Sequence, residues 1–365
     1  MSLTGTPFFL LTVAFLIAAT VALLLLWNRV PGPGALRWGG RTGLALLSQF
    51  AAVVMVLVYV NNSMGPFYES WADLFGDSGQ AQLSDPTGGK PQPGSADQTA
   101  VHHGTLRFRP FHGGAVQAEA VGPASQVRGS LYVWLPPQYQ DPAYANTDFP
   151  VVELLSGFPG SPQTWFGSMA VGKEMTALMA QGKVQPMILV APTLNVLGNT
   201  VDAGCADIPG VARTATWLAR DVPALVAANF RTQRGARHWG VMGYSAGAYC
   251  AVNLAVHYPG VFHAAVSLSG YNAPSAGLVT RNPALARANN PYLVLRSARK
   301  QPDVVLLMAG SLQDGDTVAA AKALLGVLRH PGASRLLTVA QGGHLVSVWH
   351  NWLPVALPWL SAQVR

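Results

Sequence analysis

Two long uncharged runs fill most of the first sixty residues. Phe8 to Trp27 and Thr42 to Val60 contain no charged side chain, and each is long enough to cross about 30 Å of hydrocarbon as a helix. A cleaved signal peptide explains the first run less well, because no basic residue precedes it and no small-residue cleavage site follows it. The alternative for the second run is a buried core helix. We expect two transmembrane helices, at about residues 8–27 and 42–60, in an anchor that comprises residues 1–62.

The segment that follows is polar and rich in glycine and proline. Within residues 61–75, large apolar side chains recur at helical spacing, which favours either a short interfacial helix or packing on the next domain. These side chains are Phe67, Trp71, Leu74 and Phe75. Residues 76–100 are rich in Gly, Pro, Ser, Asp and Gln, a composition typical of a flexible tether. We therefore expect a juxtamembrane segment and linker over residues 63–101.

A globular pattern extends over residues 102–365. Short apolar runs alternate with segments of helical periodicity, and this alternation predicts an α/β fold with a doubly wound, mostly parallel sheet. The expected strands are residues 105–108, 129–135, 151–155, 187–190, 264–268, 304–308 and 336–340. The expected helices are residues 172–181, 215–228 and 318–329. In such sheets the ligand site lies at the carboxyl ends of the strands.

Composition and charge support a membrane protein and give its orientation. Half of the residues are hydrophobic, 11% are charged, and the mean hydropathy is +0.26. Arg29, Arg37 and Arg41 lie between the two expected spans, so the positive-inside rule places this loop in the cytoplasm and the large domain outside the cell membrane. All 16 acidic residues lie beyond position 60. The remaining positive charge is mild and dispersed, which gives no indication of nucleic-acid binding.

The chain has two cysteines. Cys205 lies in an expected loop, and Cys250 lies at the start of an expected helix. An oxidising compartment favours a disulfide between them, and two buried free thiols are the alternative. Neither cysteine has a His or Cys neighbour at metal-ligand spacing, so we expect no zinc site. We expect no other metal and no organic cofactor.

The pentapeptide Gly243-Tyr244-Ser245-Ala246-Gly247 fits the G-x-S-x-G pattern of a nucleophile elbow. It follows an apolar run at residues 238–242 and precedes a helix-compatible stretch at residues 248–257. The pattern requires this context, because the serine must lie on a strained turn from strand to helix. The sequence therefore predicts that Ser245 is a catalytic nucleophile, with the Ala246 amide directed at developing negative charge.

A serine nucleophile needs a base, and the base needs an orienting acid. His344 follows the last expected strand in a glycine-rich loop, which lets it reach the serine. The competing histidines are His257, His263, His330 and His350.

The orienting acid is expected after the strand at residues 304–308. Asp314 is the preferred candidate, and Asp316 is the alternative acid, although it could simply cap the helix that begins near Thr317. Asp303 precedes the strand and lies at its far end.

An oxyanion hole needs a second amide from an earlier strand-end loop. The loop Ser156-Gly157-Phe158-Pro159-Gly160 follows the strand at residues 151–155. Its Phe158 amide is the expected partner of the Ala246 amide, and an ordinary Gly-Pro turn is the alternative interpretation.

From about Gly129 to the C-terminus, the chain resembles the putative-esterase family of α/β-hydrolases, which includes esterase D-like enzymes, feruloyl esterases and actinobacterial mycolyltransferases. The matching segments are residues 151–165, 214–226, 239–262 and 342–360. The resemblance is strongest to actinobacterial esterase-family proteins with N-terminal membrane spans. It implies Ser245, Asp314 and His344 as the triad and Phe158 and Ala246 as oxyanion donors. Mycolyltransferases generally carry Asp-Gly where this chain has Ser156-Gly157, so mycolyl transfer does not follow from it.

Together these features predict a membrane-anchored serine hydrolase that cleaves carboxylic (acyl) esters. The expected substrates are esters, lipids or glycolipids of the cell envelope, and the expected partner is the lipid bilayer. An acyltransferase with the same triad is the alternative, and a catalytically inactive envelope scaffold is a third. We also expect residues 270–301, which include Tyr271, Asn272 and Arg281, to cover the site.

Overall fold

The computed structural model describes residues 5–63 and 105–365. The chain divides into two compact units, Met1–Ser78 and Gly79–Arg365. The expected interfacial helix and tether over residues 63–101 lie almost entirely outside the described residues.

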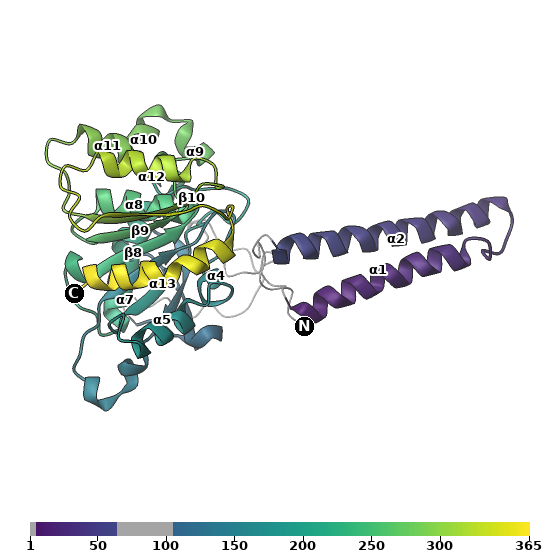
Figure 1. Ribbon diagram of the computed structural model, residues 1–365, viewed down its shortest axis with the longest axis horizontal. Coiled ribbons are helices and arrows are strands. Elements are labelled where there is room, and N and C mark those ends of the chain that lie inside the picture. The colour runs from purple at the N-terminus through teal and green to yellow at the C-terminus, as the bar shows by residue number, and fades with distance from the viewer. Residues whose placement is uncertain (1–4, 64–104) are drawn as a thin grey trace, which may run out of the picture. The chain divides into compact units, whose positions relative to one another are not determined.

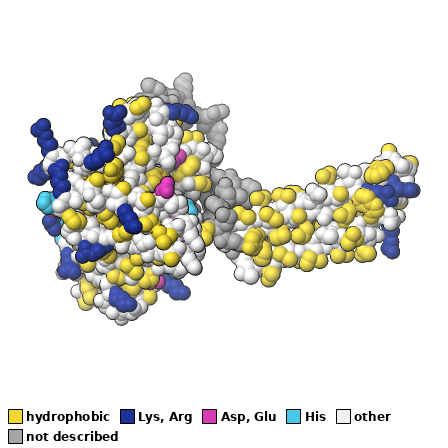
Figure 2. Space-filling view, turned by 45° about the horizontal axis from the view of Figure 1, so that its top comes forward, with side chains coloured by type: hydrophobic (Ala, Val, Ile, Leu, Met, Phe, Trp, Pro, Cys, Tyr) yellow, Lys and Arg dark blue, Asp and Glu magenta, His cyan; other side chains and the backbone are white. Residues whose placement is uncertain are grey.

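The first unit is a pair of apolar helices, α1 (Thr6–Leu26) and α2 (Gly34–Ser63). They pack along each other, with the hydroxyls of Thr20 and Ser48 3.3 Å apart. Both are long and apolar enough to cross a membrane, and only 11% and 6% of their most apolar windows are buried. This low burial distinguishes them from the core helices of a soluble domain. A space-filling view shows hydrophobic side chains along the pair and basic side chains gathered at one end (Figure 2).

Helix α2 is longer than the expected span of residues 42–60, because it begins at Gly34. The additional turns carry Arg37 and Arg41, whose side chains bind the connecting loop. The Arg41 Nε donates to the carbonyl oxygen of Trp27 at 2.8 Å, and the Arg37 guanidinium donates to the carbonyl of Gly32 at 3.3 Å. Among the described residues, the Trp27 carbonyl at the end of α1 and the Gly32 carbonyl in the connecting loop have no backbone N–H partner from a following helical turn. The two arginine side chains supply the missing donors.

The second unit is built on a nine-stranded sheet (Figure 1) with the order β1-β2-β3-β5-β4-β8-β9-β10-β11. Strands β4, β5, β8, β9, β10 and β11 are parallel to their neighbours within this set, and β1, β2 and β3 add an antiparallel edge. The strand bounds are β1 Arg109–Pro110, β2 Ala115–Val121, β3 Arg128–Trp134, β4 Val151–Leu155, β5 Ile188–Pro192, β8 Trp239–Tyr244, β9 Ala264–Leu268, β10 Val305–Ser311 and β11 Arg335–Val339. A separate two-stranded ribbon pairs β6 (Asp207–Ile208) with β7 (Ala212–Arg213).

Helices cover both faces of the sheet, as the alternating pattern predicts. On one face α7, α8, α11 and α12 contribute to a core with Val151 and Leu155 of β4. On the other face α4, α5 and α13 contribute to a core with Val152 and Leu154. The helix bounds are α4 Gln163–Phe166, α5 Val171–Ala180, α6 Thr214–Thr216, α7 Val222–Asn229, α8 Ala246–His257, α9 Gly277–Thr280, α10 Pro283–Ala288, α11 Pro291–Ser297, α12 Thr317–Gly326 and α13 Val346–Gln363. Because side chains alternate along a strand, a strand buried on both faces is apolar at nearly every position, and in β4 only Glu153 departs from this pattern.

One predicted element is wrong, and another is helical throughout but contains a π-helical turn. Residues 105–108 form no strand, because the Leu106 amide donates to the Asn229 side chain at 2.8 Å and Phe108 packs on Phe230 with ring centroids 4.9 Å apart. The expected helix at residues 215–228 is interrupted by a π-helical turn, Trp217–Asp221. In that turn Asp221 is buried, and its carboxylate accepts from the amides of Ala124 and Ser125.

Candidate active site

Ser245 lies on a sharp turn between β8 and α8, at the carboxyl end of a central strand. Its backbone has φ 56° and ψ −122°, a conformation that costs about 1–3 kcal/mol for a residue with a side chain. The glycines on either side make the turn possible. A Cβ at Gly243 would lie 2.1 Å from the carbonyl oxygen of Gly247, and one at Gly247 would lie 2.2 Å from that of Leu155. The elbow therefore requires glycine at both positions.

His344 lies directly against this serine. Its Nε2 is 2.8 Å from Ser245 Oγ, and its Nδ1 is 2.9 and 3.1 Å from the two carboxylate oxygens of Asp314. A carboxylate at Nδ1 fixes the tautomer in which Nδ1 carries the proton, so that Nε2 is free to accept the serine proton. The Asp314 side chain is 8% exposed and that of His344 is 44% exposed. The arrangement can activate a hydroxyl nucleophile.

The structure brings Asp314, and not Asp316, to the histidine. Strand β10 continues to Ser311, and the turn that follows is held by bonds from the Asp314 amide to the Ser311 carbonyl and from the Thr317 hydroxyl to the Asp314 carbonyl. Asp316 is exposed, and its side chain makes no capping bond to helix α12.

The competing histidines lie elsewhere. His263 and His350 bond to backbone carbonyls, those of Asp303 and Met169. His257 ends helix α8, where burial lowers its pKa. His330 is exposed in the turn before β11. In the described part of the chain, none of these four side chains bonds to a carboxylate, which separates them from His344.

The loop after β4 lies beside the nucleophile. A Cβ at Gly157 would approach the Ser245 Cβ and the Tyr244 ring to 3.1 Å, so the backbone of this loop packs directly on the elbow. Within residues 105–365, neither the Phe158 amide nor the Ala246 amide donates to another protein group. Unpartnered amides beside a nucleophile can stabilise a developing oxyanion.

Trp349 is a site residue that the sequence reasoning missed. Its ring lies edge-on to the His344 imidazole, with centroids 4.9 Å apart and planes at 87°. Its indole N–H donates to Ser269 Oγ at 2.9 Å, and the ring stacks on that of Tyr244, with centroids 4.6 Å apart. The available signal was its position five residues after His344 on an apolar helix face. A residue at that distance cannot be distinguished from ordinary core by sequence pattern alone.

A small pocket adjoins the elbow. Its lining includes Ala246 and the stacked rings of Tyr249 and Tyr271, which are 5.1 Å apart. Burial raises the pKa of both phenols, so they stay neutral. The wall combines these aromatic rings and apolar side chains with two polar residues, Asp202 and Ser275.

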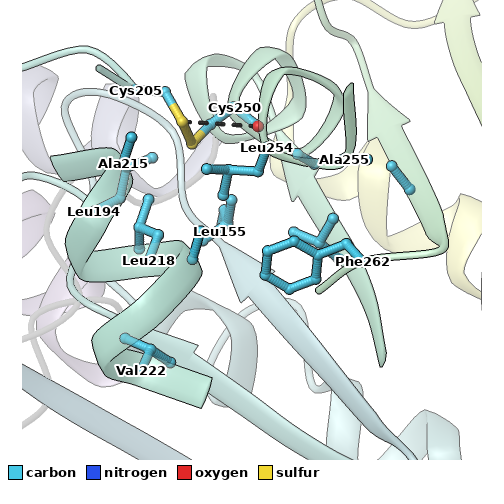
Figure 3. Close-up of a cluster of buried hydrophobic side chains, with 14 of the residues drawn as sticks. Leu155, Leu194, Cys205, Ala215, Leu218, Val222, Cys250, Leu254, Ala255 and Phe262 are labelled. Atoms are coloured by element: carbon cyan, nitrogen blue, oxygen red, sulfur yellow. Dashed lines mark hydrogen bonds between the residues drawn. A yellow bond between two sulfur atoms is a disulfide. The ribbon is translucent and has the colours of Figure 1, made fainter. Parts of the chain in front are cut away.

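A disulfide between Cys205 and Cys250 forms part of the same wall, with Cα atoms 5.3 Å apart (Figure 3). It ties the loop before β6 to the helix that begins at the nucleophile. Of the residues expected to cover the site, Tyr271 reaches the pocket wall. Asn272 instead donates to the Ala320 carbonyl, and Arg281 is exposed at the end of α9.

Residues 125–360 match the sequence profile of the family described as "Putative esterase". An uncharacterised protein of Corynebacterium glutamicum is 26% identical over 246 residues, covering 63% of this chain and 56% of that protein. The chain thus spans little more than half the length of that curated relative.

Solved structures show a similar fold. A ferulic acid esterase aligns with a TM-score of 0.58 and 20% identity, covering 68% of this chain and 98% of its own. An S-formylglutathione hydrolase from Agrobacterium tumefaciens aligns with a TM-score of 0.57 and 15% identity, covering 71% and 99%. These likenesses confirm the predicted fold class, a mostly parallel, doubly wound α/β sheet of the α/β-hydrolase type.

Proposed function

The chain belongs to the Putative esterase family, and from this premise we propose that it is a carboxylic ester hydrolase, a membrane-anchored serine esterase with Ser245, His344 and Asp314 as its catalytic triad. The observation that carries the proposal is the continuous chain of contacts through His344. Ser245 Oγ lies 2.8 Å from Nε2, and the Asp314 carboxylate lies 2.9 Å from Nδ1.

The proposed reaction has two steps. Ser245 Oγ attacks the ester carbonyl carbon while His344 Nε2 takes the hydroxyl proton, and the carbonyl oxygen becomes an oxyanion. The amides of Phe158 and Ala246 stabilise this charge, which is worth about 3 kcal/mol for each donor. The C–O bond to the alcohol then breaks, and His344 returns the proton to the leaving oxygen. Water repeats the sequence on the acyl-enzyme, releasing the acid and restoring the serine.

The Asp314 carboxylate orients the imidazole and stabilises the imidazolium that forms in each step. Its side chain is nearly buried, so the attraction is weakly screened. The role proposed for Asp314 does not require it to accept the proton.

We further place the catalytic domain, residues 102–365, outside the cell membrane, held by an anchor of residues 1–62 through a linker of residues 63–101. Three arginines between the helices support a cytoplasmic loop. The disulfide supports an oxidising compartment. This location would give the enzyme access to envelope esters, including lipids and glycolipids.

An acyltransferase with the same triad differs only in the second step, where a substrate hydroxyl replaces water. Product analysis distinguishes the two: free acid alone supports hydrolysis, and an esterified sugar or lipid acceptor supports transfer.

The experiment that tests the proposal is labelling of the full-length chain in detergent with a fluorophosphonate probe, together with p-nitrophenyl acetate hydrolysis. We expect the wild type to be labelled and active, and Ser245→Ala to be neither. A folded wild type that resists the probe would instead support the inactive scaffold.

A further inference from the structure

A buried asparagine holds the loop that carries the Phe158 amide. Asn195 lies three residues after β5 and is 5% exposed. Its Nδ2 lies 3.1 Å from the carbonyl oxygen of Gly157 and 2.6 Å from that of Gly160. It also lies 3.2 Å from Asn199 Oδ1. An amide nitrogen that faces three acceptors must present its hydrogens to them, because the amide oxygen in its place would be repelled.

The bond to Gly157 acts on the same peptide unit that contains the Phe158 N–H. This peptide is trans, and in a trans peptide the C=O and N–H bonds point in opposite directions. Holding the carbonyl oxygen towards Asn195 therefore directs the N–H to the other side of the loop. A Cβ at Gly157 would approach the Ser245 Cβ to 3.1 Å, so this loop lies against the nucleophile. The direction of this one peptide plane therefore decides whether the N–H faces an oxyanion on the serine adduct.

Asn195 is itself held on a rigid segment. The preceding Thr193 accepts the buried indole N–H of Trp217 on its carbonyl at 2.9 Å, and its hydroxyl accepts the Ser130 amide at 3.0 Å. Beyond Asn195, Asn199 Oδ1 also lies 3.4 Å from the Gly160 amide. The asparagine thus connects the loop after β4 to the end of β5 through fixed partners. A hydrogen bond to the carbonyl also polarises the peptide and strengthens its N–H as a donor.

We infer that Asn195 is a positioning residue for catalysis: by holding the Gly157 carbonyl, it aims and polarises the Phe158 amide of the oxyanion hole. This inference rests on the proposed function. Asn195 touches no reacting atom, so its effect must appear in the stabilisation of the tetrahedral state and not in the binding of the ground-state ester.

The test compares Asn195→Ala and the isosteric Asn195→Asp with Asn253→Ala in the full-length protein in detergent. Asn253 is a matched control, because it is 1% exposed and its Nδ2 donates to a loop carbonyl, that of Cys205, at 3.0 Å. Two quantities are measured: kcat and KM for p-nitrophenyl acetate, and the inhibition constant of trifluoroacetone, whose adduct with the serine carries an oxyanion. Fluorophosphonate titration counts the active sites, so misfolded protein does not lower kcat.

We expect both Asn195 variants to lower kcat about 10- to 100-fold and to change KM less than about threefold. The inhibition constant of trifluoroacetone should rise by a factor similar to the loss in kcat. Asn253→Ala should change kcat and the inhibition constant of trifluoroacetone by no more than about threefold each, even if the thermal midpoint of this variant is lower. Wild-type kcat and inhibitor affinity in Asn195→Asp, which keeps the shape and removes the donor, would overturn the inference. So would equal losses in the Asn253 variant. Failure of the proposed function is a separate result, since it would appear as undiminished activity in Ser245→Ala.

Discussion

The indole ring of Trp349 stands edge-on against the imidazole of His344, with the ring centroids 4.9 Å apart. A hydrogen bond also fixes the indole ring, since its N–H donates to Ser269 Oγ at 2.9 Å. Ser269 adopts a left-handed conformation with φ 60°, and its amide donates to the Ala309 carbonyl. The histidine of the proposed triad thus packs against Trp349. The indole of Trp349 is in turn held by Ser269, which follows β9 and bonds to β10.

Replacing Trp349 should therefore reduce turnover through the position of His344. Trp349→Phe keeps a ring at the contact but loses the bond to Ser269, and we expect a kcat loss of about threefold to tenfold with little change in KM. Trp349→Ala empties a buried site and should also lower the stability by about 3–5 kcal/mol. Steady-state kinetics and thermal unfolding measure the two effects. Unchanged kcat in the phenylalanine variant would limit Trp349 to packing.

The two aspartates after β10 provide a matched pair. Asp314→Asn places an amide where the carboxylate meets Nδ1, which disfavours the productive tautomer, and kcat should fall about 10⁴-fold. Asp316→Asn changes an exposed side chain and should leave kcat within about twofold of wild type. Esterase assays of both variants, normalised by active-site titration, measure the difference. A large loss in Asp316→Asn with an active Asp314→Asn would reverse the assignment of the acid.

Local sequence signals identified most of the sheet and the site. The G-x-S-x-G turn was predictable because the need for glycine is local: a Cβ at Gly243 would clash with the backbone of Gly247, only four residues later. Apolar runs such as Val151–Leu155 were predictable because a strand buried on both faces is apolar at nearly every position, and Glu153 is the one exception in this strand. The mixed composition of β2, Ala115–Val121, gave no comparable signal, and this strand was missed.

Positions defined by contacts between distant segments were not predictable. Asn195 bonds to Gly157 and Gly160, more than thirty residues earlier, and one asparagine in a loop carries no mark of such a partner. Polar and apolar residues alternate over 105–108 as they would in a strand. The Leu106 amide nevertheless donates to the side chain of Asn229, 123 residues later in the sequence, and not to a neighbouring strand. In both cases a tertiary contact decides the local structure, and a single sequence does not contain that contact in readable form.

Removing the disulfide should destabilise the catalytic unit. It closes a loop with a sequence separation of 45 residues, and the chain-entropy account assigns about 4 kcal/mol to such a loop. Because Cys205 and Cys250 also line the pocket, we expect Cys205→Ser/Cys250→Ser to loosen the pocket and raise KM for small esters more than it lowers kcat. Thermal unfolding with and without dithiothreitol measures the first effect, and the double variant should no longer respond to the reductant. If dithiothreitol reduces the disulfide of the unfolded wild type but its thermal midpoint does not fall, the prediction is contradicted.

Glu153 makes the stability depend on pH. It lies in the middle of β4, is 0% exposed, and neither carboxyl oxygen has a hydrogen-bond partner among the described residues. Burial raises its pKa well above the ordinary value of 4.5. Above pH 4.5 the unfolded chain loses this proton and the folded chain keeps it, so the free energy of unfolding falls as pH rises towards the folded pKa, by up to about 1.4 kcal/mol per pH unit.

A variant that cannot ionise removes this slope. Glu153→Gln keeps the size of the side chain and stays neutral, so its thermal midpoint should exceed that of the wild type at pH 7 and approach it near pH 5. Glu119 and Asp202 also have pKa values raised by burial, but they are present in both proteins and cancel in the difference. Glu153→Leu, which additionally removes the unpaired polar atoms, should gain further at every pH. Thermal unfolding of the three proteins in detergent from pH 5 to pH 7 provides the comparison. Parallel curves for wild type and Glu153→Gln would mean that Glu153 titrates alike in both states, and the buried carboxyl would then have to be reached by water.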